Sequence, residues 1–334
     1  MDQQPVLDVK NLKTTFSTER GKITAVDGIS FALKRGEILG VVGESGCGKS
    51  ATAQSILRLY DEHYTSYAGE VWYEGRDLLS LHPTDMHSVR GNHISMIFQD
   101  PLSSLNPVYT IGNQIAEAIL IHKNVTRREA NARVIELLRM VGIPAPTQRV
   151  KEYPHELSGG MRQRVMIAMA LACEPKVLIA DEPTTALDVT IQAQIMNLIK
   201  ELNKKFDMGI ILITHDLGVV AEVCTRVLVM YLGQIVEEAD VHSLFTHPRH
   251  PYTRGLMKSI PQLDCDRSEP LHVIEGMVPS LHKIPQGCRF APRCPYADDL
   301  CHAKMPALEV HGNGQKVRCW HAEKITQDAK VTHA

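Results

Sequence analysis

The residues Gly43-Glu44-Ser45-Gly46-Cys47-Gly48-Lys49-Ser50 follow the apolar residues 38–42 and precede a segment with a helical pattern. A strand, a glycine-rich turn and a helix in this order bring backbone N–H groups and a helix N-terminus onto one anion. The three glycines permit the turn, Lys49 supplies a positive charge for the β- and γ-phosphates, and Ser50 offers a hydroxyl to Mg²⁺. The stretch therefore predicts a phosphate-binding loop.

One position next to this loop and one within it carry further expectations. Ala51 stands where many nucleoside triphosphatases place a second hydroxyl, so any side-chain contact to the α-phosphate must come from elsewhere, and Thr52 is a candidate. Cys47 lies beside Lys49 and the predicted helix N-terminus, both of which lower the pKa of a thiol. We therefore expect a reactive thiol at Cys47, whose alkylation blocks ATP binding.

The composition excludes several classes of protein. The 334 residues suggest about two domains, and a net charge of −2 with 5% aromatic residues leaves no basic surface for a nucleic acid, which we therefore do not expect as a partner. Neither a signal-like N-terminus nor an apolar run near the ~18 residues of a membrane span is present, so we expect a soluble cytosolic chain. Eight cysteines in such a chain indicate thiols or metal ligands rather than disulfides.

Polar groups end three further apolar runs, each predicted to be a buried strand. They are Gln99 after residues 94–98, Asp181 and Glu182 after residues 177–180, and His215 after residues 210–214. Because functional groups of open α/β sheets gather at the carboxyl ends of the strands, we expect these groups to meet the phosphate-binding loop at one edge.

The chemistry that suits such a set of groups is phosphoryl transfer to water. Asp181 is the predicted Mg²⁺ ligand, with Ser50 and Gln99, and Glu182 is the predicted base that deprotonates the attacking water. Gln99 reaches both metal and water, His215 donates to the γ-phosphate, and Lys49 completes the catalytic set.

Changes in periodicity suggest the domain organisation. Residues 111–140 have a helical pattern with a capping box at Thr126 and Glu129, which indicates a mostly helical insert over residues 99–157. We expect an α/β P-loop ATPase domain over residues 1–250, made of a core (about 1–98 and 158–250), an antiparallel β subdomain and that insert. The composition then shifts to Pro, His and Cys, which predicts a small extension over residues 251–334.

Phe16 opens a predicted polar loop, residues 16–22, between two N-terminal strands. An exposed aromatic ring at this place would stack on a nucleobase, which needs only a π-face. The alternative is a phenylalanine at a strand end that packs in the core.

The chain resembles the ATPase subunit of an ABC transporter over about residues 5–245. The matching segments are the phosphate-binding loop, Gln99 of the Q-loop, the signature Leu157-Ser158-Gly159-Gly160-Met161, the second nucleotide motif at residues 177–182, the D-loop Ala186-Leu187-Asp188 and the switch histidine His215. In this family the signature caps ATP on the opposite subunit, where Ser158 and Gly160 touch the γ-phosphate at the start of a helix. The resemblance therefore implies nucleotide contacts at Ser158, Gly159, Gly160 and Asp188, and a head-to-tail dimer.

Residues 98–107 (FQDPLSSLNP) and His250-Pro251-Tyr252 are similar to the dipeptide and oligopeptide importer branch of this family. The similarity implies a peripheral subunit at the cytoplasmic face of the membrane, acting with a second homologous ATPase (a heterodimer, or a homodimer in isolation), two transmembrane permease subunits and an extracytoplasmic peptide-binding protein. Nickel chelates and antimicrobial peptides are alternative cargoes. A soluble ABC ATPase acting on nucleic acid or the ribosome would have a coiled-coil insert or two cassettes, and the sequence has neither.

Cys288, Cys294, Cys301 and Cys319 lie in a Pro- and Arg-rich segment with little core of its own, which suggests a metal site. Their spacing leaves structural Zn²⁺, an iron–sulfur cluster and free thiols open. The resemblance to the peptide importers implies a [4Fe–4S] cluster. The remaining cysteines outside the loop, Cys173, Cys224 and Cys265, have no expected role.

Overall fold

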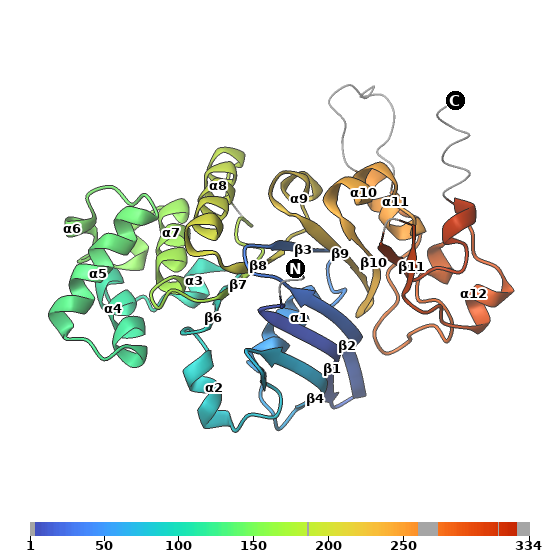
Figure 1. The fold of residues 1–334 in the computed structure, drawn as a ribbon, viewed down its shortest axis with the longest axis horizontal. Coiled ribbons are helices and arrows are strands. Elements are labelled where there is room, and N and C mark those ends of the chain that lie inside the picture. The colour runs from blue at the N-terminus through green and yellow to red at the C-terminus, as the bar shows by residue number, and fades with distance from the viewer. Residues whose placement is uncertain (1–3, 186, 260–272, 313, 326–334) are drawn as a thin grey trace. The chain divides into compact units, whose positions relative to one another are not determined.

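The computed structural model describes residues 4–185, 187–259, 273–312 and 314–325 (Figure 1). The chain divides into two compact units that alternate along the sequence. The first unit comprises residues 1–8, 32–38 and 71–213, and the second comprises residues 9–31, 39–70 and 214–334. Among the described helices, none combines the length and the apolar composition that a membrane span requires.

The first unit contains a parallel sheet of β6 (Ile94–Ile97), β7 (Val177–Asp181) and β8 (Gly209–Ile213), with β7 in the centre. Every residue of β7 and β8 is buried, as expected for parallel strands that are covered on both faces. The strands predicted from the apolar runs are therefore confirmed to within a residue at each end. The end of β4 (Thr65–Tyr73) pairs with β5 (Arg76–Asp77), and α2 (Pro83–Val89) follows.

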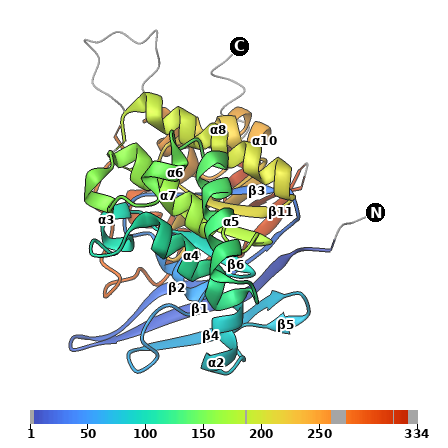
Figure 2. The ribbon, with the colours of Figure 1, turned by 90° about the vertical axis from the view of Figure 1, so that its left-hand side faces the viewer.

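Most of the first unit outside these strands is helical, and Figure 2 shows the molecule from the side of these helices. They are α3 (Pro101–Ser104), α4 (Ile111–His122), α5 (Arg127–Met140), α6 (Pro146–Arg149), the 3₁₀ helix η1 (Pro154–Glu156), α7 (Gly159–Ala170) and α8 (Val189–Phe206). The predicted capping box is present at the start of α5, where Thr126 and Glu129 satisfy each other's backbone N–H groups. The segment between residues 99 and 157 is thus helical, as predicted.

Two N-terminal strands of the second unit form a long hairpin, and the predicted loop at residues 16–22 is wrong. β1 (Leu7–Thr18) continues through Phe16, and only two residues separate it from β2 (Gly21–Leu33). Gly21 has φ 110°, which permits the tight turn. Phe16 is half-buried, and its ring packs edge-on against Tyr60 with the centroids 4.7 Å apart.

The second unit also contains β3 (Ile38–Val42), whose residues 39–42 pair in parallel with β9 (Arg226–Tyr231). β9 forms an antiparallel hairpin with β10 (Gln234–Asp240), as predicted. The turn residues Leu232 and Gly233 both have positive φ, 43° and 79°, as hairpin turns of two residues require. Helices α1 (Lys49–Ile56), α9 (Leu217–Val223), α10 (Val241–Thr246) and α11 (Pro251–Lys258) belong to this unit.

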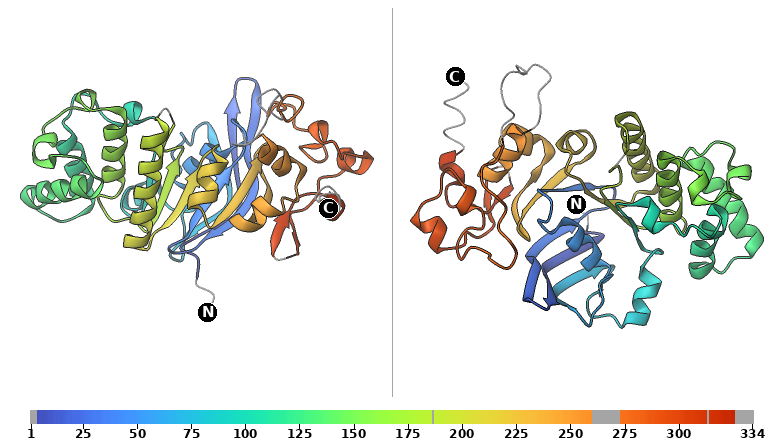
Figure 3. Two further views of the ribbon diagram at one scale, coloured as in Figure 1. Left: turned by 90° about the horizontal axis from the view of Figure 1, so that it is seen from above. Right: turned by 180° about the vertical axis from the view of Figure 1, so that it is seen from behind.

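The C-terminal segment joins the sheet of the second unit. β12 (Gln315–Val317) pairs with β10 on one side and with β11 (Glu309–His311) on the other, and the short helices η2 (Ala291–Arg293) and α12 (Asp299–Ala303) precede these strands. The buried Glu237 carboxylate accepts the N–H groups of Arg249 (2.7 Å) and His250 (3.0 Å) and the amide of Gln315 (2.6 Å). The orange and red segments accordingly lie side by side in both views of Figure 3.

Candidate nucleotide-binding site

The phosphate-binding loop connects β3 to α1, in the predicted order of strand, turn and helix. Gly43 and Gly48 have φ of 154° and 103°. A Cβ at Gly43 would lie 2.3 Å from the Met230 carbonyl oxygen, and one at Gly48 would lie 2.5 Å from the Ala25 carbonyl oxygen. Both positions therefore require glycine, for the space as much as for the backbone angle.

Lys49 lies at the start of α1 and points back over the loop. Its Nζ donates to the carbonyl oxygens of Gly43 (2.8 Å) and Glu44 (3.1 Å). Thr52 is 4% exposed and its hydroxyl donates to the Gly48 carbonyl at 2.9 Å. The expectation that Thr52 contacts the α-phosphate is therefore wrong, because its hydroxyl is buried and used inside the helix.

Cys47 differs from the expected reactive thiol. Its side chain is 1% exposed, and burial raises its pKa despite the neighbouring Lys49. The loss of hydration destabilises the thiolate by more than the positive charge of Lys49 stabilises it. The thiol is therefore a packing element of the loop.

The first unit carries the two adjacent carboxylates. Asp181 ends β7 and is 3% exposed, and Glu182 follows it with a φ of 45°, unusual for a residue with a side chain. The Glu182 N–H donates to Ile213 at 2.9 Å, which holds this turn against the end of β8. The Glu182 carboxylate accepts hydrogen bonds from the Gln99 amide at 2.9 Å and the Thr185 hydroxyl at 3.0 Å.

The structure thus brings Gln99 and Glu182 together, as their predicted roles around one water molecule require. Sequence reasoning missed Thr185, the other donor to this carboxylate. His215 belongs to the second unit and is exposed, directly before α9. Asp216 caps that helix by accepting the N–H of Gly218 at 2.8 Å. The cap fixes the backbone of the residue that follows His215.

The signature and the D-loop lie next to each other in the first unit. Ser158 caps α7 and Asp188 caps α8, where it accepts the Ile191 N–H at 2.9 Å. Both capping residues are exposed, and a Cβ at Gly160 would lie 2.9 Å from Cγ2 of Ile191. Ala186 of the D-loop lies outside the described residues. Two helix N-termini thus face solvent side by side, with the positive ends of their dipoles outward.

All four cysteines of the extension line one small cavity of about 10 Å³, together with His250, Phe290 and His321. Burial raises the pKa of Cys294 to about 11 and that of Cys319 to about 12. Burial likewise raises the pKa of Cys288 and Cys301. The four thiols thus share one cavity and are buried enough to be difficult to ionise.

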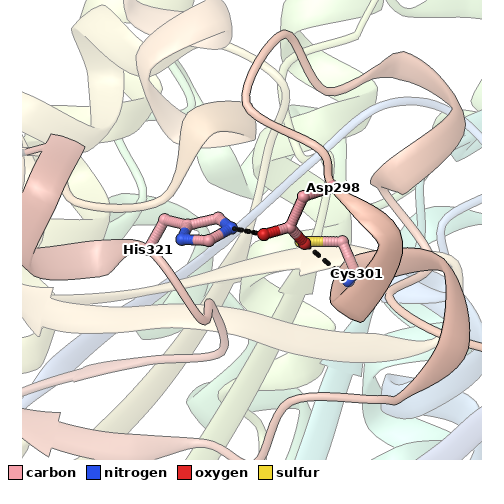
Figure 4. Close-up of side chains that lie close together, drawn as sticks. All are labelled: Asp298, Cys301 and His321. Atoms are coloured by element: carbon pink, nitrogen blue, oxygen red, sulfur yellow. Dashed lines mark hydrogen bonds and ion pairs between the residues drawn. The ribbon is translucent and has the colours of Figure 1, made fainter.

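Asp298 and His321 stand beside this cavity and were not predicted. Figure 4 shows the Asp298 carboxylate between His321 and Cys301. It pairs with Nε2 of His321 at 3.0 Å and accepts the Cys301 N–H at 2.9 Å, so that it caps α12. The donor atoms of Asp298, Cys301 and His321 lie within 4.8 Å of one another. The Cys-x-His spacing of residues 319–321 is the sequence signal that could have found the histidine.

Two further cysteines lie within the described part of the chain, and both are packed in the interior. Cys173 and Cys224 are buried, which raises the pKa of both thiols, that of Cys224 to about 12. Cys265 lies outside the described residues.

Residues 26–185 match the family model for the ABC transporter, and residues 236–301 match that for the oligopeptide/dipeptide transporter, C-terminal region. The chain is 53% identical to the oligopeptide transport ATP-binding protein AppD of Bacillus subtilis, over 96% of this chain and 97% of that protein. It is 48% identical to the dipeptide transport ATP-binding protein DppD of the same organism, over 99% and 97% of the two chains.

A solved dimeric ATP-binding cassette, in a post-hydrolysis state bound to ADP and phosphate, is similar in structure. It matches with a TM-score of 0.64 and 28% identity over 70% of this chain and 98% of that one. The region that matches the ABC transporter model, residues 26–185, contains the phosphate-binding loop, the signature and the Asp181-Glu182 pair. The chain therefore belongs to the ATP-hydrolysing subunits of ABC transporters, in the family of dipeptide and oligopeptide importers.

Proposed function

We propose that the chain powers the import of dipeptides or oligopeptides by hydrolysing ATP at the cytoplasmic face of the membrane. The observation that carries this proposal is full-length similarity to peptide-transport ATPases that extends through the C-terminal region, residues 236–301. The cassette alone would be common to ABC transporters of many cargoes. The C-terminal match and the similarity to oligopeptide and dipeptide transport proteins support peptides as the cargo, with nickel chelates and antimicrobial peptides as the alternatives.

In the proposed hydrolysis, Glu182 deprotonates the attacking water, and the Gln99 amide, 2.9 Å from its carboxylate, helps to orient that water. Lys49 and the loop N–H groups hold the phosphates, and His215 donates to the γ-phosphate. Ser50, Gln99 and Asp181 would hold Mg²⁺, a cation that prefers oxygen donors and whose charge offsets that of the phosphates.

The exposed signature supports a head-to-tail dimer. Ser158 and Gly160 lie at the solvent-facing start of α7, beside Asp188. They belong to a different segment from the phosphate-binding loop of the same chain. We propose that they cap ATP held by a second, homologous ATPase subunit, and that two permease subunits and a peptide-binding protein complete the importer. This arrangement makes the chain a peripheral membrane protein.

We also propose that Cys288, Cys294, Cys301 and Cys319 hold a metal centre. The resemblance favours a [4Fe–4S] cluster, with Zn²⁺ as the alternative. The cavity that the four cysteines line is small, about 10 Å³, and among the described residues the ligand atoms within 4.8 Å of one another are those of Asp298, Cys301 and His321, so either centre would require the four sulfurs to rearrange. Anaerobic purification with metal analysis and visible absorption distinguishes the two. Iron with inorganic sulfide supports the cluster, zinc supports the ion, and neither metal would sink the proposal.

The transport proposal is tested by uptake of labelled dipeptides and oligopeptides in cells that carry the wild-type chain or Glu182→Gln. Glu201→Gln, an exposed carboxylate on α8, is the matched control. We expect the control to transport normally and Glu182→Gln to lose peptide uptake. Loss of nickel-chelate uptake with intact peptide uptake would overturn the peptide assignment but leave the ATPase assignment standing.

A further inference from the structure

The C-terminal segment holds the second residue of the phosphate-binding loop. Arg293 is the last residue of η2. Its two terminal guanidinium nitrogens, Nη1 and Nη2, donate to the two oxygens of the Glu44 carboxylate at 2.7 and 3.0 Å. The backbone N–H of Glu44 donates to the hydroxyl of Tyr252, on α11, at 2.7 Å. The side chain and the main chain of one loop residue are therefore both bound by residues more than 200 positions away.

Arg293 is held firmly for this contact. Its guanidinium also donates to the carbonyl oxygens of Ile274 and Glu275, each at 3.1 Å. Its charged carbon lies 5.9 Å from the ring centroid of Tyr231 and 6.0 Å from that of Phe290. The side chain is only 4% exposed, against 27% for Glu44. A planar, fully bonded arginine in an aromatic setting keeps its position and its charge.

The pairing matters because Glu44 is a carboxylate in a loop that must bind a polyphosphate. The Glu44 carbonyl accepts Lys49 Nζ at 3.1 Å, so this residue adjoins the cation that serves the phosphates. An uncompensated negative charge here repels the ligand, and weak screening in a partly buried site strengthens that repulsion. The bidentate Arg293 removes most of it.

We propose that Arg293 is a positioning residue for ATP: it neutralises and orients Glu44, so that the C-terminal segment completes the charge balance of the phosphate-binding loop. The segment then acts on nucleotide affinity from within the same subunit. This inference rests on the proposed ATP site, but not on the identity of the cargo.

The fold should survive the loss of Arg293, because the segment has other anchors. Arg289, four residues earlier, donates to the Leu232 carbonyl and pairs with Asp27. β12 remains paired with β10, and Glu237 still binds the backbone of residues 249 and 250. Replacing Arg293 therefore removes one charge without detaching the segment.

The test compares the ATP dissociation constant of the purified full-length chain in five forms: wild type, Arg293→Met, Glu44→Gln, the double variant and Arg254→Met. Arg254 is an arginine of α11 that donates to the Ile325 carbonyl, and it serves as the control for loss of a cation from the same segment. We expect Arg293→Met to weaken ATP binding about tenfold or more, equivalent to about 1.4 kcal/mol, and Arg254→Met to leave it unchanged.

Rescue separates a charge effect from a structural one. If Arg293 acts by neutralising Glu44, the double variant binds ATP within about threefold of Glu44→Gln alone, and Arg293→Lys, which keeps the charge, lies between wild type and Arg293→Met. Unchanged affinity in Arg293→Met, or a double variant as weak as Arg293→Met, overturns the proposal. Wild-type chain that binds no ATP contradicts the ATP site itself, so the two failures are distinguishable.

Discussion

The amide of Gln99 donates a hydrogen bond to the carboxylate of Glu182 across 2.9 Å. Gln99 follows β6 and Glu182 follows β7, two neighbouring parallel strands, so the pairing register of the sheet places them together. Glu182 has a left-handed backbone conformation, which is unfavourable for a residue with a side chain. The hydrogen bond from its N–H to the Ile213 carbonyl stabilises this conformation. The proposed base and the proposed water-orienting amide are thus held by two separate strand ends.

Replacing Gln99 by Ala should lower the turnover number for ATP by roughly 10- to 100-fold, because the base loses the group that orients it and its water. The Michaelis constant should rise less than turnover falls, because Ser50 and Asp181, the other proposed Mg²⁺ ligands, and the phosphate-binding loop remain. Steady-state phosphate release measures both quantities. Thr185→Val, which removes the other hydrogen bond to Glu182, should have a smaller effect.

Replacing Glu182 by Gln should lower turnover by roughly 10²-fold or more and leave ATP binding intact, because the amide keeps the shape of the side chain but removes the base. ATP should then accumulate on a trapped dimer, visible as a dimer peak in size-exclusion chromatography with ATP and Mg²⁺. Near-normal turnover would falsify the role of Glu182 as the base.

Replacing Gly160 by Ala should impair hydrolysis far more than binding of ATP. The new Cβ would lie 2.9 Å from Cγ2 of Ile191, so the Ile191 side chain or the two helices α7 and α8 must shift at the surface that we propose faces the partner. Gly159→Ala is the matched control, since its Cβ would lie at an ordinary 3.6 Å from Leu187. ATP-dependent dimer formation is the measurement, and equal effects of the two variants would contradict this prediction.

Alkylation of Cys47 should be slow in the folded chain. Burial raises the pKa of this thiol and shields the sulfur, so the thiolate that reacts is scarce near neutral pH. The rate should rise about tenfold per pH unit below the raised pKa, because the thiolate fraction does. Peptide mapping by mass spectrometry after timed exposure to iodoacetamide measures it. Fast modification at pH 7 in the folded protein would restore the expectation of a reactive thiol.

The second unit should lose stability on acidification through His250. This residue caps α11 by accepting the Tyr252 N–H at 3.1 Å, and complete burial lowers its pKa to about 3. Its unfolded pKa is about 6.5, so the neutral form stabilises the fold above that pH, and the contribution falls by about 1.4 kcal/mol per unit as the pH drops toward 3.

The variant His250→Asn keeps an acceptor for the cap and removes the titration. Between pH 7 and pH 5, its free energy of unfolding should therefore fall by about 2 kcal/mol less than that of the wild type. His242→Gln, at an exposed histidine of α10, is the control and should follow the wild type. Urea unfolding monitored by circular dichroism provides the values, and parallel pH profiles for all three chains would contradict the role of His250.

The sequence by itself determined the parts that depend on local order along the chain. Residues 43–50, the buried strands and the capping box at Thr126 could be predicted because a phosphate-binding loop, a parallel strand and a helix start each need particular residues at fixed spacing. The placement of Gln99, Asp181 and Glu182 at or just after the ends of buried strands could be predicted in the same way, and their roles stay predictions. Local patterns gave wrong predictions at Phe16 and Thr52. The segment predicted as a polar loop at Phe16 is part of a β-hairpin, and the Thr52 hydroxyl donates to the Gly48 carbonyl at the start of its own helix.

Only the tertiary structure decided what lies around the loop. Burial reverses the expected pKa shift of Cys47, because desolvation depends on the packing of distant elements such as β9. The same holds for Arg293, which reaches Glu44 across 249 positions of sequence. No rule of sequence spacing links such residues. Their contact depends on tertiary packing, in which β12 pairs with β10 and the guanidinium of Arg293 lies over the aromatic rings of Tyr231 and Phe290.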